Sequence, residues 1–163
     1  MSAKILVIRS GGAGDTRAIG AAFARSLPPG ATLSLEGPLG AGKTEFVRGF
    51  CEGFGAAGPV TSPTYTLCNE YTAPDGRRLV HVDAFRLRDG ADLEALALEE
   101  RREPNGTVLV EWGDRVIDAL PPDTVRVRIE PLAEEDARRL YVGLPEAMAL
   151  AGESFASLAE EER

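Results

Sequence analysis

The sequence predicts an α/β fold in which a mixed β-sheet is flanked by helices and followed by a C-terminal β-hairpin and helix. Short apolar runs alternate with stretches whose apolar residues recur at helical spacing. Two later segments alternate apolar and charged residues, as antiparallel strands with one solvated face do. Glycine- and proline-rich turns separate these stretches. The length of 163 residues suits one domain, and we expect a single domain over residues 1–163.

The N-terminal elements are defined by apolar runs and by residues that begin or end helices. A continuous apolar run predicts a strand over Lys4–Arg9. Asp15 can cap a helix over Thr16–Leu27, which the Pro-Pro-Gly segment at 28–30 ends. Alternating leucines then predict a strand over Ala31–Glu36. The residues expected on the buried side of the first helix are Ile19, Ala22, Phe23 and Leu27.

The middle of the chain predicts two helices and a hairpin. One helix begins at Thr44 and ends at the glycine-rich segment before Pro59. Tyr65–Thr72 and Arg78–Leu87 are extended segments, and the Ala-Pro-Asp-Gly turn between them favours a hairpin. Asp89–Glu100 is expected to be helical, with its leucines facing inward and its acids facing solvent. The inward-facing residues of these two helices are Phe46, Val47, Phe50, Leu93, Leu96 and Leu98.

The C-terminal elements are a buried strand, an antiparallel pair and a helical tail. Thr107–Glu111 is a dense run of β-branched residues and leucine, which is typical of a buried strand. Val125–Glu130 and Leu140–Leu144 alternate apolar residues with other residues and predict the antiparallel pair. Residues 145–163 are rich in alanine and acidic residues, and we expect a helical tail there.

A phosphate-binding loop lies between the strand at 31–36 and the helix that begins at Thr44. It reads Gly-Pro-Leu-Gly-Ala-Gly-Lys-Thr and predicts a P-loop NTPase. Its glycines allow backbone N–H groups to point at an anion, and the helix N-terminus adds its dipole. Lys43 would reach the β- and γ-phosphates, and the Thr44 hydroxyl would hold Mg²⁺. The loop residues expected to bind nucleotide are Gly37, Leu39, Gly40, Ala41, Gly42, Lys43 and Thr44.

Two carboxylates stand at the ends of apolar strands, where α/β folds bind ligands. Asp83 and Glu111 are therefore candidates to hold Mg²⁺ or the attacking water, unless they merely leave the core for solvent. Trp112 follows directly, and strand alternation would point it away from Glu111. It could stack on a base or ribose, or fill the core. His81 shares a strand face with Asp83 and is either structural or catalytic.

Charge and composition restrict the classes of partner. The net charge is −8, with +3 in residues 1–50, −6 in residues 51–130 and −5 in residues 131–163. The glycine-rich loop lies in the positive part, while the whole chain is too acidic to act as a stand-alone nucleic-acid binder. No apolar run approaches membrane-spanning length and no signal peptide is evident, so we expect a cytoplasmic protein. Cys51 and Cys68 lack metal-ligand or redox spacing and are expected to be reduced thiols.

Four segments carry a family resemblance: Gly37–Thr44, Ser62–Leu67 with Tyr71, His81–Arg86 and Glu111-Trp112. Together they resemble the TsaE (YjeE) family of small bacterial P-loop ATPases. The resemblance extends from about Asp15 to about Leu144. It implies binding and hydrolysis of ATP with Mg²⁺, in support of threonylcarbamoyladenosine formation in tRNA. The implied partners are the transferase TsaD and TsaB, which act after TsaC makes threonylcarbamoyl-AMP, and tRNA would be reached only through these proteins.

The resemblance also implies roles for individual residues. Lys43 and Thr44 would bind phosphate and Mg²⁺, Glu111 would support the metal, and Asp83 would serve the nucleotide or its hydrolysis. Trp112 would lie near the nucleotide, and Thr16 would lie near the base. The segment from Ser62 to Thr64 would be a first switch and the stretch around Asp83 a second, because such segments can sense the γ-phosphate.

Two positions depart from the commonest family pattern, and two other functions stay open. Pro38 stands where aspartate is frequent, and Phe85 stands where tyrosine is frequent. A small-molecule kinase would need an acceptor pocket and an arginine-bearing lid, for which Arg101 and Arg102 are the candidates. A non-catalytic, nucleotide-dependent binding module would need neither feature.

Overall fold

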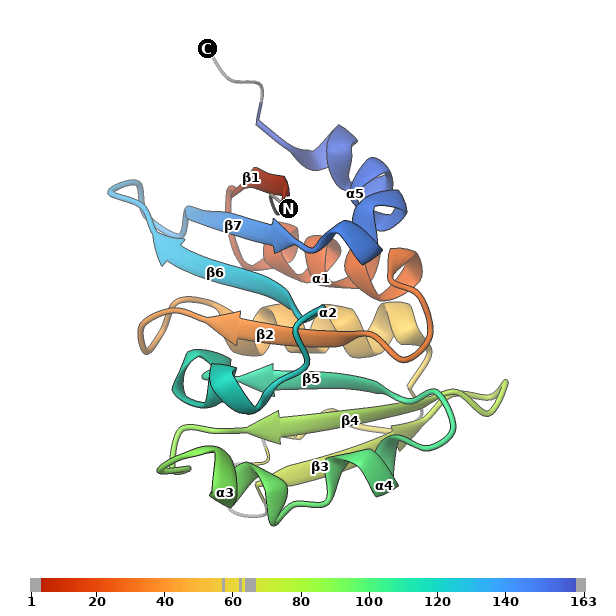
Figure 1. Ribbon diagram of the computed structural model, residues 1–163. Helices are drawn as coiled ribbons and strands as arrows, with labels where there is room; N and C mark the ends of the chain where they lie inside the picture. The colour runs from red at the N-terminus through yellow and green to blue at the C-terminus, as the bar shows by residue number, and fades with distance from the viewer. Residues whose placement is uncertain (1–3, 57, 62, 64–66, 161–163) are drawn as a thin grey trace.

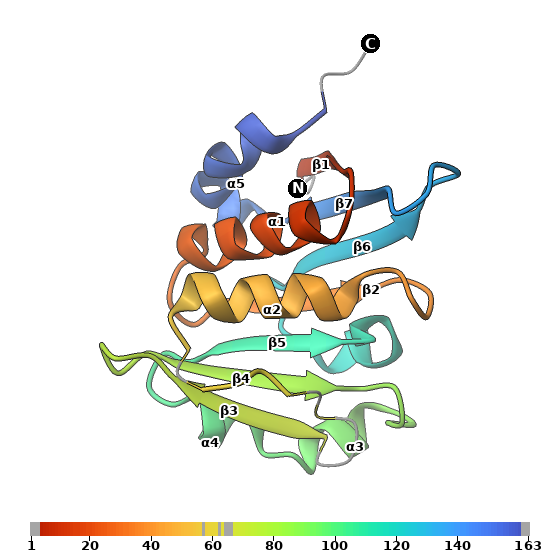
Figure 2. The ribbon, with the colours of Figure 1, turned by 180° about the vertical axis from the view of Figure 1, so that it is seen from behind.

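The computed structural model describes residues 4–56, 58–61, 63 and 67–160. In this part of the chain, seven strands form one sheet in the order β1-β7-β6-β2-β5-β4-β3 (Figure 1). Helices α3 and α4 cover the face that is in front in Figure 1, and helices α1, α2 and α5 cover the other face, which Figure 2 brings forward. The predicted α/β class, with a mixed sheet flanked by helices, is confirmed.

The central strands of the sheet are parallel, and its edges are antiparallel. Strand β2 runs parallel to β5 and β6, and β5 runs parallel to β4. Strands β7 and β1 continue the sheet beyond β6 in antiparallel pairs, and β3 pairs antiparallel with β4 at the other edge. The expected hairpins are therefore present. The bounds are β1 (Lys4–Ser10), β2 (Thr32–Glu36), β3 (Cys68–Thr72), β4 (Arg78–Asp83), β5 (Thr107–Glu111), β6 (Val125–Pro131) and β7 (Arg138–Leu144).

The larger core lies between the sheet and helices α1 (Ala13–Ser26), α2 (Lys43–Phe54) and α5 (Ala149–Phe155). The Phe23 ring stacks on Phe155 with 4.0 Å between centroids, and it meets the Phe46 ring edge-on. These rings are fully buried, so they join the three helices through a continuous apolar contact.

Glycines allow α1 and α2 to approach each other closely. A Cβ atom added at Gly49 of α2 would lie 1.8 Å from the carbonyl oxygen of Arg17 in α1. Added Cβ atoms at Gly20 and Gly53 would come within 2.2 Å and 2.4 Å of carbonyl oxygens of the facing helix. This contact fixes the position of α2, whose first residue belongs to the phosphate-binding loop.

Short helices cover the opposite face of the sheet. They are α3 (Gly90–Glu94), α4 (Leu98–Arg102) and the 3₁₀ segment η1 (Gly113–Ala119). Leu93 and Val116 from these segments pack on a smaller core that includes the valines of β4 and β5 facing this side. Within the residues that the structure describes, every helix is too short or too polar to span a bilayer.

Three predicted helices differ in their bounds. The helix expected from Thr16 begins at Ala13, and Gly12 takes the N-cap position instead of Asp15. The carboxylate of Asp15 accepts a hydrogen bond from the Gly11 N–H and so supports the loop before the helix. The continuous helix expected over Asp89–Glu100 is wrong, because the left-handed backbone of Ala97 (φ 51°) separates α3 from α4. The expected tail helix is broken into η2 (Glu146–Met148), α5 and η3 (Ala156–Leu158).

The hairpin strands are shorter than predicted. The second strand ends at Asp83 instead of Leu87, because the Asp83 carboxylate accepts a hydrogen bond from the Phe85 N–H and begins a turn. The first strand begins at Cys68. The sequence predicts that this strand begins at Tyr65, but Tyr65 and Thr66 lie outside the described residues.

Candidate functional site

The loop between β2 and α2 has the backbone shape that an anion site requires. Gly37, Gly40 and Gly42 all adopt positive φ angles, of 139°, 78° and 107°. A Cβ atom at Gly37 would lie 2.3 Å from the carbonyl oxygen of Ile129, so glycine is required there by contact as well. The loop leads directly into the N-terminus of α2, where the Thr44 side chain is exposed. The predicted strand–loop–helix context is thus confirmed.

The ammonium of Lys43 folds back onto the loop. Its Nζ donates hydrogen bonds to the carbonyl oxygens of Gly37 at 2.7 Å and Pro38 at 2.9 Å. It also lies 3.8 Å from the centroid of the Trp112 ring, a cation–π contact. Burial lowers the pKa of Lys43, while the carboxylates of Glu111, Asp114 and Asp83 act in the opposite direction. The positive charge is therefore held at the loop, close to three carboxylates.

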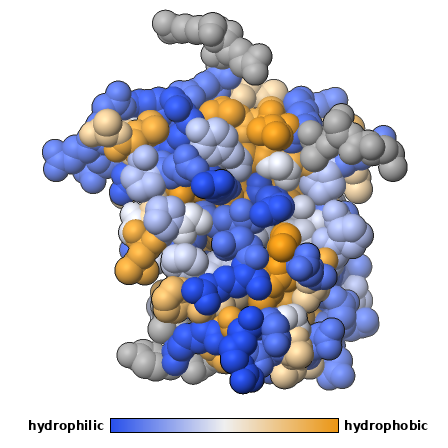
Figure 3. All heavy atoms as spheres, turned by 60° about the vertical axis from the view of Figure 1, so that its left-hand side comes forward, coloured by the Kyte–Doolittle hydropathy of each residue, from blue (hydrophilic) through white to orange (hydrophobic). Residues whose placement is uncertain are grey.

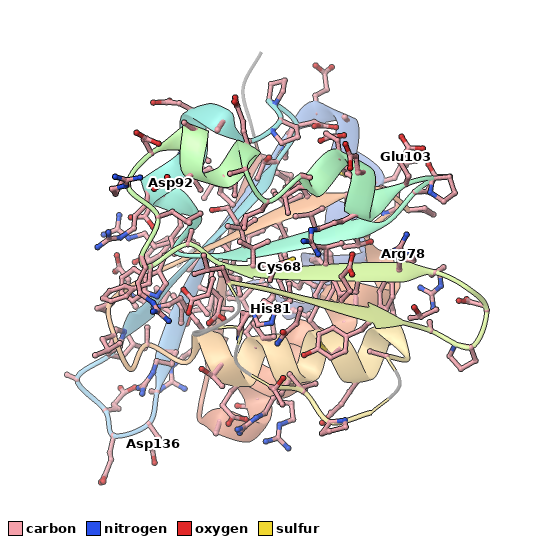
Figure 4. All side chains as sticks on the ribbon, turned by 90° about the horizontal axis from the view of Figure 1, so that it is seen from below. Cys68, Arg78, His81, Asp92, Glu103 and Asp136 are labelled. Carbon is pink, nitrogen blue, oxygen red and sulfur yellow. The ribbon has the colours of Figure 1, made fainter. Side chains whose placement is uncertain are left out.

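The two predicted acids lie side by side. Parallel strands end at one edge of a sheet, and the register pairs Asp83 of β4 with Glu111 of β5. Glu111 is 8% exposed, and Asp83 is half-buried. Glu111 Oε2 lies 2.8 Å from His81 Nε2. Figure 4 labels His81 between the sheet and α2, the side on which Asp83 also lies by strand alternation.

Trp112 does not obey the strand alternation that the sequence suggested. Strand β5 ends at Glu111, and Trp112 adopts a left-handed backbone (φ 59°) that turns the chain. Its ring consequently covers Lys43 and lies 5.0 Å from the Phe85 ring. Gly113 allows this turn to lie close to β2, because a Cβ atom there would lie 2.1 Å from Ser34 Oγ. The structure thus brings Trp112 into the site.

Thr16 lies beside the loop, with its hydroxyl engaged inside the protein. It is 1% exposed, and its Oγ1 lies 2.7 Å from Ser10 Oγ. A Cβ atom at Gly42 would lie 3.8 Å from Thr16 Cγ2, so the methyl group faces the loop. Thr16 therefore offers the loop an apolar contact, through its methyl group.

Sequence reasoning missed two charged residues at this site. Arg138 of β7 donates from Nε to the carbonyl oxygen of Ala41 at 2.9 Å, and from Nη2 to that of Gly40 at 3.4 Å. Asp114 lies in the first turn of η1 and acts on the Lys43 charge. Asp114 could have been noted as a third acid near Glu111-Trp112, whereas no local signal marks Arg138.

The expected first switch falls mostly outside the described residues. Ser62, Thr64, Tyr65 and Thr66 are not described by the structure. The Thr61 N–H donates to Tyr71 Oη at 3.2 Å, and the Asn69 side chain donates to the Thr61 carbonyl oxygen at 3.0 Å. The approach to the segment is therefore tied to β3.

The sheet edge at which β2, β4 and β5 end faces the viewer in Figure 3. Hydrophilic residues run through the centre of this view, with apolar groups beside them. Leu39 in the loop is 85% exposed, and Phe85 after β4 is 45% exposed. The site is therefore bordered by large apolar side chains that are open to solvent.

The sequence model of one family, described as threonylcarbamoyl adenosine biosynthesis protein TsaE, matches residues 11–140. The chain belongs to the TsaE family. Its relatives include the tRNA threonylcarbamoyladenosine biosynthesis proteins TsaE of Bacillus subtilis and Streptomyces coelicolor. The first is 39% identical over 75% of this chain and 75% of the relative. The second is 39% identical over 83% of this chain and 95% of the relative.

A solved structure has the same fold over nearly the whole chain. The crystal structure of YdiB from Bacillus subtilis superposes with a TM-score of 0.76 at 31% sequence identity. The match covers 96% of this chain and 97% of that chain. The likeness to YdiB therefore extends beyond the residues that the family model matches, to the C-terminal helical segments.

Proposed function

We propose that this TsaE-family chain is a single-domain P-loop ATPase over residues 1–163. It would support threonylcarbamoyladenosine (t(6)A) modification of tRNA through a cytoplasmic complex with TsaB and TsaD. The observation that carries the proposal is the convergence of the phosphate loop, two carboxylates and a tryptophan at one sheet edge. The names of the relatives, which place those proteins in t(6)A biosynthesis, support the pathway.

The residues present suit a Mg²⁺–nucleotide complex. Mg²⁺ usually takes one or two carboxylates, phosphate oxygens and waters instead of an all-protein cage. The described residues contain no group of three or more acidic, histidine or cysteine side chains arranged to hold a metal ion without other ligands. They do offer the exposed Thr44 hydroxyl at the start of α2 and the Glu111 carboxylate at the end of β5. When bound, Mg²⁺ would supply neutralisation of the phosphate charge.

The chain's own groups divide the remaining tasks. The backbone N–H groups from Leu39 to Thr44 bind the phosphates. The Lys43 ammonium exchanges its hydrogen bonds to the Gly37 and Pro38 carbonyl oxygens for contacts with the β- and γ-phosphates. Asp83 orients the attacking water next to Glu111. Trp112 packs near the nucleotide, and Thr16 contributes its methyl group beside Gly42.

Replacing the acids tests the hydrolytic part of the proposal. Glu111→Ala and Asp83→Ala should each lower phosphate release about tenfold or more, because misplaced metal or water costs transition-state stabilisation. Asp123→Ala is the matched control, since Asp123 is an exposed acid in the turn before β6. Circular dichroism verifies the fold. Normal hydrolysis in both site variants would make these carboxylates structural.

The partner part of the proposal depends on charge and on exposed apolar residues. A chain of net charge −8 has little attraction for tRNA, so it would act through other proteins. Leu39 and Phe85 border the nucleotide site and are exposed, so a partner that covers them would sense nucleotide occupancy. Nucleotide can bias docking only by a different affinity for the two states.

Sedimentation with TsaB–TsaD in ATP, in ADP and without nucleotide tests this part. We expect nucleotide-dependent association, a rise in ATP hydrolysis on association, and weaker association for Leu39→Ala. Leu150→Ala is the control, because Leu150 is 81% exposed on α5. Equal or absent binding in all three conditions, with unchanged hydrolysis, would favour a nucleotide-binding module that acts alone.

The kinase alternative finds no support in the position of its candidate features. The cavity of about 280 Å³ between α3, α4 and β2 includes Thr32, at the opposite end of β2 from the loop. The strand rises about 13 Å over the four steps from Thr32 to Glu36, and this distance separates the cavity from the loop. Arg102 binds the Gly30 carbonyl oxygen and Thr32 at that far end, so it does not form a lid over the loop. Phosphate-transfer assays with small acceptors would detect a kinase.

A further inference from the structure

A buried pair joins strands β4 and β5 just beneath the candidate site. His81 is 2% exposed, Glu111 is 8% exposed, and their Nε2 and Oε2 atoms are 2.8 Å apart. His81 lies opposite Leu109 in the register, two residues before the point at which Asp83 meets Glu111. The imidazole therefore reaches Glu111 from the protein interior, whereas Lys43 lies on the side of the loop.

The hydrogen-bond pattern assigns the tautomer of His81. An ionised carboxylate only accepts hydrogen bonds, so Nε2 carries the proton and donates it to Glu111. His81 Nδ1 is buried and has no hydrogen-bond partner among the described residues. A proton on Nδ1 would be a buried donor without an acceptor, which is unfavourable because the donor loses its hydrogen bond to water and gains none. The single donor of the ring is thus directed at Glu111.

We propose that His81 is a positioning residue that holds the Glu111 carboxylate for the metal of the bound nucleotide. This inference rests on the proposed function, because it assigns Glu111 to Mg²⁺. A glutamate has three rotatable bonds, and a buried ring that binds Oε2 fixes the carboxylate and leaves Oε1 for the site. Such supporting hydrogen bonds typically change metal affinity 10- to 100-fold. The unpartnered Nδ1 also indicates that the ring serves Glu111 and no second group of the described core.

Substitutions of His81 separate positioning from simple packing. His81→Gln keeps an amide donor near the position of Nε2, whereas His81→Asn is one methylene shorter and does not reach Glu111. His81→Leu fills the space without any donor. A packing role predicts that all three variants differ from wild type only in stability. A positioning role predicts that the glutamine variant alone keeps the metal response.

The measurement is the affinity of the whole chain for ATP with Mg²⁺ and with EDTA, by calorimetry. The ratio of the two affinities is the metal response. We expect His81→Leu and His81→Asn to lower this ratio 10- to 100-fold. The EDTA affinity should change less than about twofold, since the phosphate contacts of the loop are retained. His81→Gln should keep a ratio within about threefold of wild type.

Two further outcomes keep the inference and the proposed function distinguishable. A wild-type protein without a metal response would overturn the Mg²⁺ assignment of Glu111 itself. A normal wild-type response that stays unchanged in His81→Leu and His81→Asn would overturn the role of His81 alone. If the leucine variant fails to fold, as circular dichroism would reveal, the asparagine and glutamine variants decide the matter. In Glu111→Gln, replacement of His81 by asparagine should cause no further loss.

Discussion

The contact between α1 and α2 makes a strong prediction about Gly49. Replacing it with alanine improves helix propensity by up to about 1 kcal/mol. The new Cβ atom, however, would lie 1.8 Å from the Arg17 carbonyl oxygen, and real contacts of this kind essentially never fall under 3.0 Å. The helices must then separate locally by roughly 1.2 Å, the difference between these distances. No side-chain rotation relieves a clash between a Cβ atom and a backbone carbonyl.

The size of the effect follows from this separation. A gap of 0.5–1 Å already forfeits a quarter to a half of each dispersion contact, and overpacking costs up to about 3 kcal/mol. After the gain in helix propensity, we expect Gly49→Ala to lower the free energy of unfolding by about 2 kcal/mol. For a chain of this length, that loss lowers Tm by roughly 4–8 °C.

Urea unfolding followed by circular dichroism measures this change, and Gly14→Ala is the matched control. Gly14 is likewise a helical glycine, in α1, but a Cβ atom there meets nothing within 4 Å, so alanine should stabilise the protein. Because α2 begins at Lys43, Gly49→Ala should also weaken nucleotide binding. If Gly49→Ala is as stable as Gly14→Ala, the close helix contact does not exist in solution.

Three other predictions concern the loop and the thiols. Lys43→Ala should weaken Mg·ATP binding at least tenfold in calorimetry, because a charged hydrogen bond contributes about 1.5–3 kcal/mol. Lys4→Ala is the control, and equal affinities of the two variants would refute the site. Arg138→Ala should weaken nucleotide binding several-fold without unfolding the protein, since its guanidinium holds the Ala41 carbonyl oxygen; unchanged affinity would make this contact incidental. Burial raises the pKa of the Cys51 thiol to about 12, so iodoacetamide at pH 8 should alkylate it only after unfolding. The unfolded thiol ionises near pH 8.5, so this contribution to stability should decline as pH rises from there toward 12, and native alkylation at the unfolded rate would contradict the burial.

The parts of the fold and site that could be predicted are those with a local signal. The loop at 37–44 has its glycines, lysine and threonine in one short stretch, and the flanking apolar patterns place it between a strand and a helix. Asp83 and Glu111 each follow an apolar run, and the rule that parallel strands end at one edge brings them together.

The parts that could not be predicted depend on tertiary contacts. Ala97 divides residues 91–100, a stretch that contains no glycine or proline, so its left-handed backbone has no sequence signal. Trp112 leaves the strand by a similar left-handed turn, which invalidates the alternation rule one residue after Glu111. Arg138 meets Ala41 across 97 positions of sequence, and such a contact appears only when the sheet is assembled.

The pairing of β1 with β7 constrains the order in which this protein can fold. Lys4 lies opposite Leu144 and Ser10 lies opposite Arg138, so the partners are separated by 128 to 140 positions of sequence. During synthesis, β1 leaves the ribosome long before its partner β7, which lies near the end of the described chain. β1 therefore stays unpaired until a late stage, and closing so long a loop costs entropy. Ser10, whose hydroxyl contacts Thr16 beside the glycine-rich loop, reaches its place with this pairing, and Arg138, which binds the Ala41 carbonyl oxygen of the loop, reaches its place once β7 has joined the sheet. A growing chain could form the P-loop early and would still lack a finished pocket until residue 144 has emerged.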